Sequence, residues 1–112
     1  MAECLFCRIV RREIPAQIVL EDDQALVFKD VSPQAPTHVL VIPKRHIGSL
    51  SATADSDVSL LGHLQRMASR VAENAGLTSF RLVTNNGRGA GQSVDHLHYH
   101  LLAGRTMQWP PG

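Results

Sequence analysis

Three histidines alternate with apolar or aromatic residues near the end of the chain, at His96, His98 and His100. On a β-strand alternate side chains share one face, so these imidazoles would lie about 7 Å apart along it. They would make a poor core, because each buried ring nitrogen without a partner costs about 1–3 kcal/mol. The face is therefore predicted to open onto a ligand, a metal or solvent, where imidazole can be a metal ligand, a nucleophile or an acid–base group.

A glycine-rich loop stands just before these histidines, with Gly87, Gly89 and Gly91 followed by Gln92 and Ser93. Glycine lets backbone N–H groups approach an anion closely, and consecutive amides form an anion-binding nest. Such loops are common and mostly inert, but the place of this one beside a histidine face indicates a phosphate cradle. An imidazole can attack phosphorus to give a phosphohistidine, and a serine hydroxyl can donate a proton to the leaving group.

The two cysteines, Cys4 and Cys7, are spaced C-x-x-C and would form half of a tetrahedral zinc site. His46 and His96 could supply the other two ligands. Two alternatives stay open, namely free thiols packed beneath a short helix and a reversible redox pair. A structural disulfide is not expected, because the chain shows no secretory signal and the cytosol keeps thiols reduced.

These residues must be positioned by the elements of one domain, since 112 residues leave no room for a second independent core. A hydrophobic share of 44% and a charged share of 19% are typical of globular proteins. The formal charge of +1 argues against a nucleic-acid binder that relies on bulk positive charge. No apolar run approaches the roughly 20 residues of a membrane span, and the first residues lack the features of a secretory signal. We therefore expect a soluble, cytoplasmic protein.

The pattern of apolar residues predicts an α+β fold with about five largely antiparallel strands and one main helix on a face of the sheet. Apolar steps of three and four residues predict the long helix, capped by Asp55 or Ser56 and ended by Gly76. A short helix is expected over 5–12 and an irregular tail over 104–112. The expected strands are 18–21 and 25–30, joined as a hairpin, then 38–42, 80–84 and 95–103.

The segment from His96 to Leu102 resembles the signature of the histidine triad (HIT) superfamily, in which three histidines alternate with apolar residues. Three further segments, 30–38, 91–93 and 109–112, are similar to its histidine triad nucleotide-binding (Hint) branch. The paired cysteines resemble those of bacterial members, which hold zinc with two cysteines, a histidine placed like His46 and the first triad histidine. The resemblance covers almost the whole chain and implies a single HIT domain over residues 1–112. Asp95 departs from it, because an aromatic residue often stands there.

This resemblance implies a five-stranded sheet with one long and one short helix, pairing into a ten-stranded sheet in a homodimer. It implies hydrolysis of purine nucleoside 5′-phosphoramidates through a covalent nucleotidyl-histidine, with no cofactor in catalysis. Three alternatives remain. The chain could be a purine-nucleotide binding module with vestigial catalysis, or a dinucleoside polyphosphate hydrolase or nucleotidyl transferase of a sister branch. It could also be a metal-dependent enzyme that uses the three triad histidines as ligands.

The resemblance also implies roles for individual residues. His98 would be the nucleophile, His100 would bind the phosphate oxygens, and Ser93 would contact the leaving nitrogen. His38 and His96 would complete a hydrogen-bonded histidine network. Asp30 would bind the ribose hydroxyls, although capping of the turn after it is an alternative. The remaining nucleotide-binding positions would be Phe6, Ile9, Phe28, Val31, Asn85, Gly91, Gln92 and Val94, with Ile14 at the edge of the slot. The zinc ligands would be Cys4, Cys7, His46 and His96.

Overall fold

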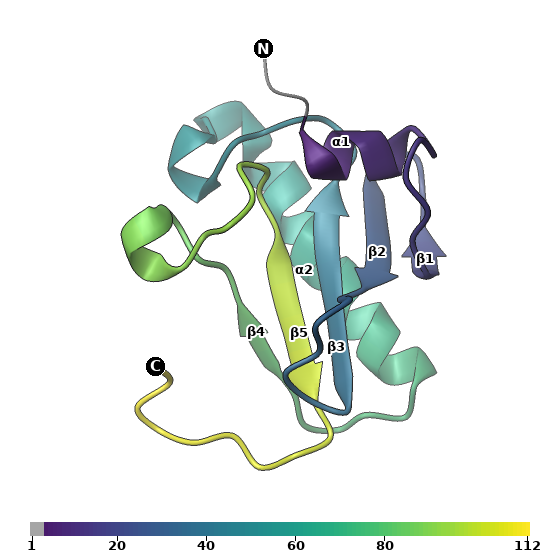
Figure 1. Ribbon diagram of the computed structural model, residues 1–112, viewed down its shortest axis with the longest axis vertical. Helices are drawn as coiled ribbons and strands as arrows, with labels where there is room; N and C mark the ends of the chain where they lie inside the picture. Colours follow the sequence, from purple (N-terminus) through teal and green to yellow (C-terminus); the bar gives the residue numbers. More distant parts are fainter. Residues whose placement is uncertain (1–3) are drawn as a thin grey trace.

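Five antiparallel strands form one sheet in the order β1-β2-β3-β5-β4 (Figure 1). The structure is a computed structural model that describes residues 4–112. Residues 1–3 of the expected domain, and the expectation about the start of the chain, lie outside the described residues. The fold class is confirmed as α+β with one long and one short helix. The elements are α1 (Leu5–Val10), β1 (Ile18–Glu21), β2 (Ala25–Lys29), β3 (Thr37–Pro43), α2 (Val58–Asn74), β4 (Arg81–Val83) and β5 (Tyr99–Ala103), with 3-10 turns at Leu50–Ala52, Asp55–Asp57 and Arg88–Ala90.

The predicted hairpin is present between β1 and β2. Its turn is held by Asp22, whose Oδ1 accepts hydrogen bonds from the backbone N–H groups of Gln24 and Ala25 at 2.9 and 2.8 Å. An aspartate that bonds to the backbone two and three residues ahead mimics part of a turn and fixes its direction. The other oxygen of Asp22 lies 2.6 Å from Nε2 of His63, which joins this turn to α2.

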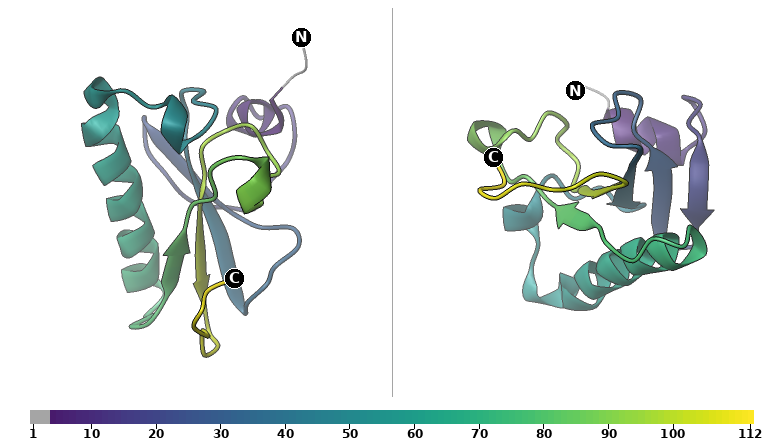
Figure 2. Two further views of the ribbon diagram at one scale, coloured as in Figure 1. Left: turned by 90° about the vertical axis from the view of Figure 1, so that its left-hand side faces the viewer. Right: turned by 90° about the horizontal axis from the view of Figure 1, so that it is seen from below.

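The sheet separates two apolar clusters, and β3 contributes to both. Val39 and Val41 pack with α2 on one face, while Leu40 and Ile42 pack with α1 on the other. This alternation follows from the two-residue period of a strand, and burial on both faces explains why β3 is almost wholly apolar. Figure 2 shows α2 lying along its face of the sheet, with α1 at one end of the opposite face.

The long helix follows the expected apolar stripe but begins later than either predicted cap. The residues from Asp55 to Asp57 form a 3-10 turn, and the carboxylate that closes this turn belongs to Asp57. Its Oδ2 accepts from Ala54 N–H at 2.8 Å, and its Oδ1 is bonded to Arg45. Gly76 ends the helix with a φ of 70°, as predicted. Over residues 4–112, no helix is long and apolar enough to span a membrane.

The prediction of a final strand over 95–103 is wrong in its first half, because β5 begins only at Tyr99. The backbone before it bonds elsewhere: Leu97 N–H donates to the carbonyl of Ile47 at 2.6 Å, and the His96 carbonyl accepts from a side chain. The first two triad histidines therefore precede the strand, and only His100 lies on it. Residues 104–112 follow β5 without a helix or strand.

Candidate active site and metal centre

A cavity of about 1040 Å³ lies between α1 and the face of the sheet that α1 covers. It brings together ten of the predicted catalytic and nucleotide-binding residues, which come from four stretches of the chain: 6–9, 28–31, the start of β3 and 93–100. They are Phe6, Ile9, Phe28, Asp30, Val31, His38, Ser93, Val94, His98 and His100, together with Ile14 at the predicted edge.

Three predicted binding residues are not among those that line the cavity, namely Asn85, Gly91 and Gln92. The cavity is also lined by residues that the sequence analysis did not single out, among them Leu40 and Gln34. In the sequence, Leu40 looks like an ordinary core residue of a strand. Because it stands two residues after His38, however, its side chain must share the face of the sheet that carries His38. In the sheet it lies directly opposite His100. Gln34 carries no signal of its own, because it acts through its backbone.

His98 is buried, with 4% of its surface exposed, and the backbone fixes its tautomer. Its Nδ1 lies 2.7 Å from the carbonyl oxygen of His96, and a carbonyl only accepts hydrogen bonds, so Nδ1 carries the proton. In the neutral ring, Nε2 is then the nitrogen with the free lone pair. The ring of Phe6 packs edge-on against His98 with centroids 5.2 Å apart. This is the arrangement that a nucleophilic imidazole requires.

A second pair of histidines forms a directed chain of hydrogen bonds. The backbone N–H of Gln34 donates to Nδ1 of His38 at 3.0 Å, so the proton of the neutral His38 ring sits on Nε2. That nitrogen lies 2.9 Å from Nδ1 of His100 and donates to it. The neutral His100 ring then carries its own proton on Nε2, where it can donate to an anion in the cavity.

Asp30, His38 and His100 also lie close enough together to be considered as metal ligands. Their protonation opposes this use, because Nε2 of His38 carries a proton and a metal-binding nitrogen must offer a lone pair. Asp30 Oδ2 lies 3.4 Å from that nitrogen, while its Oδ1 accepts from Ser32 N–H at 2.8 Å. Asp30 therefore caps the turn, as the alternative suggested, and lines the cavity as well. Val31, the next residue, is 97% exposed at the rim.

Burial lowers the pKa of His100 to about 4, and the neighbouring His98 and His38 act in the same direction. In the unfolded chain the pKa of histidine is about 6.5. As the pH falls from about 6.5 to about 4, the unfolded chain therefore takes up a proton that the folded chain does not. The free energy of unfolding must decrease across this window.

The variant His100→Gln should lose this dependence, because glutamine does not titrate. We expect its free energy of unfolding to fall less steeply with acid, by up to about 1.4 kcal/mol per pH unit relative to the wild type. Denaturant titrations at several pH values between about 4 and 7 measure the two slopes. Parallel slopes for the two proteins would contradict the assignment of a neutral, buried His100.

The side chain of Gln92 is buried and engaged within the protein. Its Oε1 accepts from Gly87 N–H at 2.8 Å, and its Nε2 donates to the carbonyls of Gly48 and Val94 at 2.8 and 3.0 Å. These bonds hold the glycine-rich loop to the segment after β3. The sequence alone does not show whether Gln92 binds the ligand, as expected, or holds the loop through bonds within the protein.

Arg88 holds the same loop from outside. One of its terminal nitrogens donates to the Ser93 carbonyl at 2.9 Å and the other to Asp95 Oδ2 at 3.0 Å. Asp95, the departure from the family pattern, is therefore paired with the arginine that fixes the backbone of Ser93. Sequence reasoning missed Arg88, since an arginine in a loop is not distinguished from a solvated surface residue.

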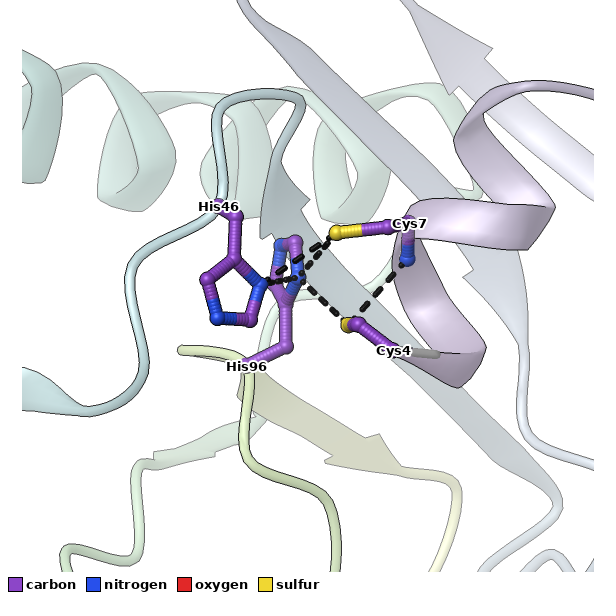
Figure 3. Close-up of side chains that lie close together, drawn as sticks. All are labelled: Cys4, Cys7, His46 and His96. Atoms are coloured by element: carbon purple, nitrogen blue, oxygen red, sulfur yellow. Dashed lines mark hydrogen bonds between the residues drawn. The ribbon is translucent and has the colours of Figure 1, made fainter. Parts of the chain in front are cut away.

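The four predicted zinc ligands converge on one point (Figure 3). The Sγ atoms of Cys4 and Cys7 lie 3.2 and 3.6 Å from Nδ1 of His96, and Nδ1 of His46 lies 3.2 Å from both Cys7 Sγ and His96 Nδ1. Zinc bonds of about 2.0–2.1 Å to nitrogen and 2.3 Å to sulfur place tetrahedral ligands roughly 3.3–3.8 Å apart. These four spacings fit a tetrahedral ion to within about 0.4 Å, and all four donor atoms lie within 4.8 Å of one another.

The tautomer of His96 also suits a metal. Its Nε2 lies 2.8 Å from the carbonyl of Pro43 and must donate to it, which leaves the lone pair on Nδ1, inside the cluster. Full burial of the ring lowers the pKa of His96 to about 4, so the ring is neutral. The cluster of Cys4, Cys7, His46 and His96, hereafter the Cys₂His₂ cluster, could therefore hold a metal ion. The ligand atoms of His96, His98 and His100 do not gather at one point: His96 belongs to the Cys₂His₂ cluster and His100 to the group with Asp30 and His38.

The family model of the HIT domain matches residues 11–107. The chain belongs to the HIT family. An uncharacterized HIT-like protein of Synechocystis is 57% identical over 114 residues, which cover the whole of both chains. A HIT family hydrolase from Legionella pneumophila superposes with a TM-score of 0.96 at 49% identity, covering 98% of this chain and 100% of that one. A HIT family hydrolase from Clostridium thermocellum gives a TM-score of 0.92 at 44% identity and covers 96% of each chain.

Proposed function

We propose that the protein hydrolyses purine nucleoside 5′-phosphoramidates, acting through a covalent nucleotide on His98. The observation that carries the proposal is the hydrogen bond from His98 Nδ1 to the His96 carbonyl, which leaves a lone pair on Nε2 of a ring that lines the cavity. The solved relatives named as hydrolases support hydrolysis as the reaction class. Catalysis by an imidazole nucleophile needs no cofactor.

In the first step, Nε2 of His98 forms a bond to phosphorus while the bond from phosphorus to the leaving nitrogen breaks. The departing amine takes a proton, and we assign its donation to the hydroxyl of Ser93, which lines the same cavity. The Nε2–H of His100 hydrogen-bonds a phosphoryl oxygen and stabilises the charge that develops there. Because His38 and Gln34 fix this tautomer, the donor is in place before the substrate binds.

In the second step, water attacks phosphorus and the bond to His98 breaks, which returns the lone pair to Nε2. One proton of the water restores the Ser93 hydroxyl, and the remaining hydroxide becomes an oxygen of the nucleoside monophosphate that is released. We place the purine between the apolar side chains of the cavity, chiefly Phe6, Ile9 and Phe28. Asp30 binds the ribose through the carboxylate oxygen that does not cap the turn.

Turnover of adenosine 5′-phosphoramidate tests this proposal. We expect release of AMP and ammonia, with the dinucleotide diadenosine tetraphosphate cleaved far more slowly. Chromatography of the nucleotide products distinguishes the two substrates. Binding of AMP without turnover of either compound would indicate a nucleotide-binding module instead, and preferential cleavage of the dinucleotide would indicate a sister branch of the family.

We also propose that the Cys₂His₂ cluster binds one structural zinc ion per chain. The donor spacing and the tautomer of His96 support this, and Cys₂His₂ is a common ligand set of structural zinc sites. Elemental analysis of protein purified without added metal is expected to give about one equivalent of zinc per chain. Less than about a tenth of an equivalent, with Cys4 and Cys7 both reacting freely with a thiol reagent, would refute the site.

A homodimer in the cytoplasm is the setting we propose for this activity. Strand β4 forms one edge of the sheet, and the exposed aromatic side chains of Phe80 and Trp109 are contributed by the residue before β4 and by the C-terminal tail. A second cavity of about 810 Å³ lies beside this edge, between residues 76–81 and 104–107. Pairing of two such edges would give one continuous sheet. Sedimentation at the mass of a single 12.3 kDa chain would refute the dimer.

A further inference from the structure

The helix that supplies two ligands of the Cys₂His₂ cluster also supplies a wall of the cavity. Cys4 and Cys7 flank Phe6, whose ring packs against His98, and Ile9 lines the cavity further along the helix. With six residues, α1 is too short to be stable by its own hydrogen bonds. Its position therefore depends on the packing of its two buried side chains and on the cluster that holds its N-terminal end.

The segment that carries the nucleophile is attached to the same cluster. The ring of His96 contributes Nδ1 to the cluster, and the backbone carbonyl of the same residue fixes the tautomer of His98. Phe6 touches both rings, with centroid distances of 5.9 Å to His96 and 5.2 Å to His98. The two sides of the cavity thus meet at one group of four ligands.

We propose that the Cys₂His₂ cluster sets the nucleotide affinity of the cavity: a zinc ion bound there locks α1 and the His96–His98 segment in the arrangement that binds a purine nucleoside monophosphate. This inference rests on the proposed function, because it takes the cavity as the nucleotide site. Without the ion, the nucleotide must itself order these two segments. The cost of ordering then reduces the observed affinity, as for any binding site that is not preorganised.

His46 is the ligand that separates this proposal from direct effects on the cavity. It comes from the loop after β3, and it is not among the residues that line the cavity. Its ring nitrogen faces Cys7 Sγ and His96 Nδ1, both at 3.2 Å. Because the His46 side chain contacts the cluster and not the cavity, we expect a change in nucleotide affinity on its substitution to act through the cluster, and metal stripping of the wild type tests this independently.

The test compares His46→Ala with the wild type by AMP calorimetry, zinc analysis and far-UV circular dichroism. We expect the variant to lose its zinc, to keep its secondary structure, and to bind AMP at least tenfold more weakly. His63→Ala is the matched control, since it removes another partly exposed histidine, on α2, that is paired with Asp22 away from the cavity. Its AMP affinity should stay within twofold of the wild type.

AMP affinity is also measured for wild-type protein that has been stripped with a chelator, and again after it is reloaded with Zn²⁺. This second experiment tests the proposal even if His46→Ala keeps its metal or fails to fold. A reversible loss of at least tenfold in AMP affinity is expected. Unchanged affinity after stripping, or global loss of secondary structure, overturns the proposal and leaves the proposed function standing. Wild-type protein that takes up no zinc overturns it too. If the zinc-loaded wild type binds no AMP, the nucleotide function itself fails.

Discussion

Replacement of His98 by asparagine should reduce the hydrolysis of adenosine phosphoramidate by about 10⁴-fold or more, which is the scale of losing a catalytic nucleophile. Asparagine is chosen because its side-chain N–H can still donate toward the His96 carbonyl that His98 Nδ1 now bonds at 2.7 Å. The variant removes the attacking lone pair while retaining a donor for that buried acceptor. AMP affinity should change by much less than the rate, because the phosphate donor His100 and the apolar slot remain.

Rapid quenching followed by mass spectrometry should find one nucleotidyl group on the wild-type chain, at His98, and none on His98→Asn. The control is His63→Asn, the same substitution at a histidine outside the cavity, which should turn over at the wild-type rate. A label on another residue, or rapid turnover by His98→Asn, would contradict the mechanism. Loss of AMP binding in this variant would show instead that the substitution had disturbed the cavity.

Replacement of Phe6 by alanine should lower the free energy of unfolding by about 3–5 kcal/mol, the usual cost of removing a buried phenylalanine ring. Phe6 is 4% exposed and packs edge-on against Phe28 and two triad histidines, so its loss leaves a cavity at the junction of slot, nucleophile and cluster. Urea titration measures the change. The adjacent Leu5, which is 45% exposed, gives the control: Leu5→Ala should cost less than about 1 kcal/mol.

If Phe6→Ala cost as little as Leu5→Ala, α1 would not be packed on the sheet as described. AMP calorimetry on the folded fraction adds a second observation, because Phe6 lines the slot. We expect clearly weaker binding for Phe6→Ala. Leu5 also borders the cavity but is half exposed, so Leu5→Ala should bind only slightly more weakly than the wild type.

Local patterns in the sequence were enough to predict most of the fold. The uninterrupted apolar run in β3 reflects burial on both faces, and the apolar stripe of α2 reflects burial on one. The turn at Asp22 could be predicted because the hydrogen bonds of its carboxylate reach only two and three residues ahead. The late start of the last strand, at Tyr99, could not be predicted, because it depends on a hydrogen bond from Leu97 to Ile47, fifty residues away.

The candidate site was predictable where residue types repeat at a fixed spacing, as in the triad and the cysteine pair. The directions of its hydrogen bonds were not predictable. Which nitrogen of His38 carries a proton depends on the backbone of Gln34, and the placement of Ser93 depends on Arg88. Neither partner differs in type from an ordinary loop residue, so only three-dimensional contacts reveal what each does.

Strand β3 is paired on both sides and buried along nearly its whole length. Residues of the candidate site lie at both of its ends. His38 lies at its beginning, and the loop that carries His46 follows its end. Native-state hydrogen exchange should therefore find the slowest amides in the middle of β3, with faster exchange in α1 and in residues 44–48. Local fluctuations of α1 and residues 44–48 can then admit or release a nucleotide, while β3, which joins the histidines, keeps its hydrogen bonds.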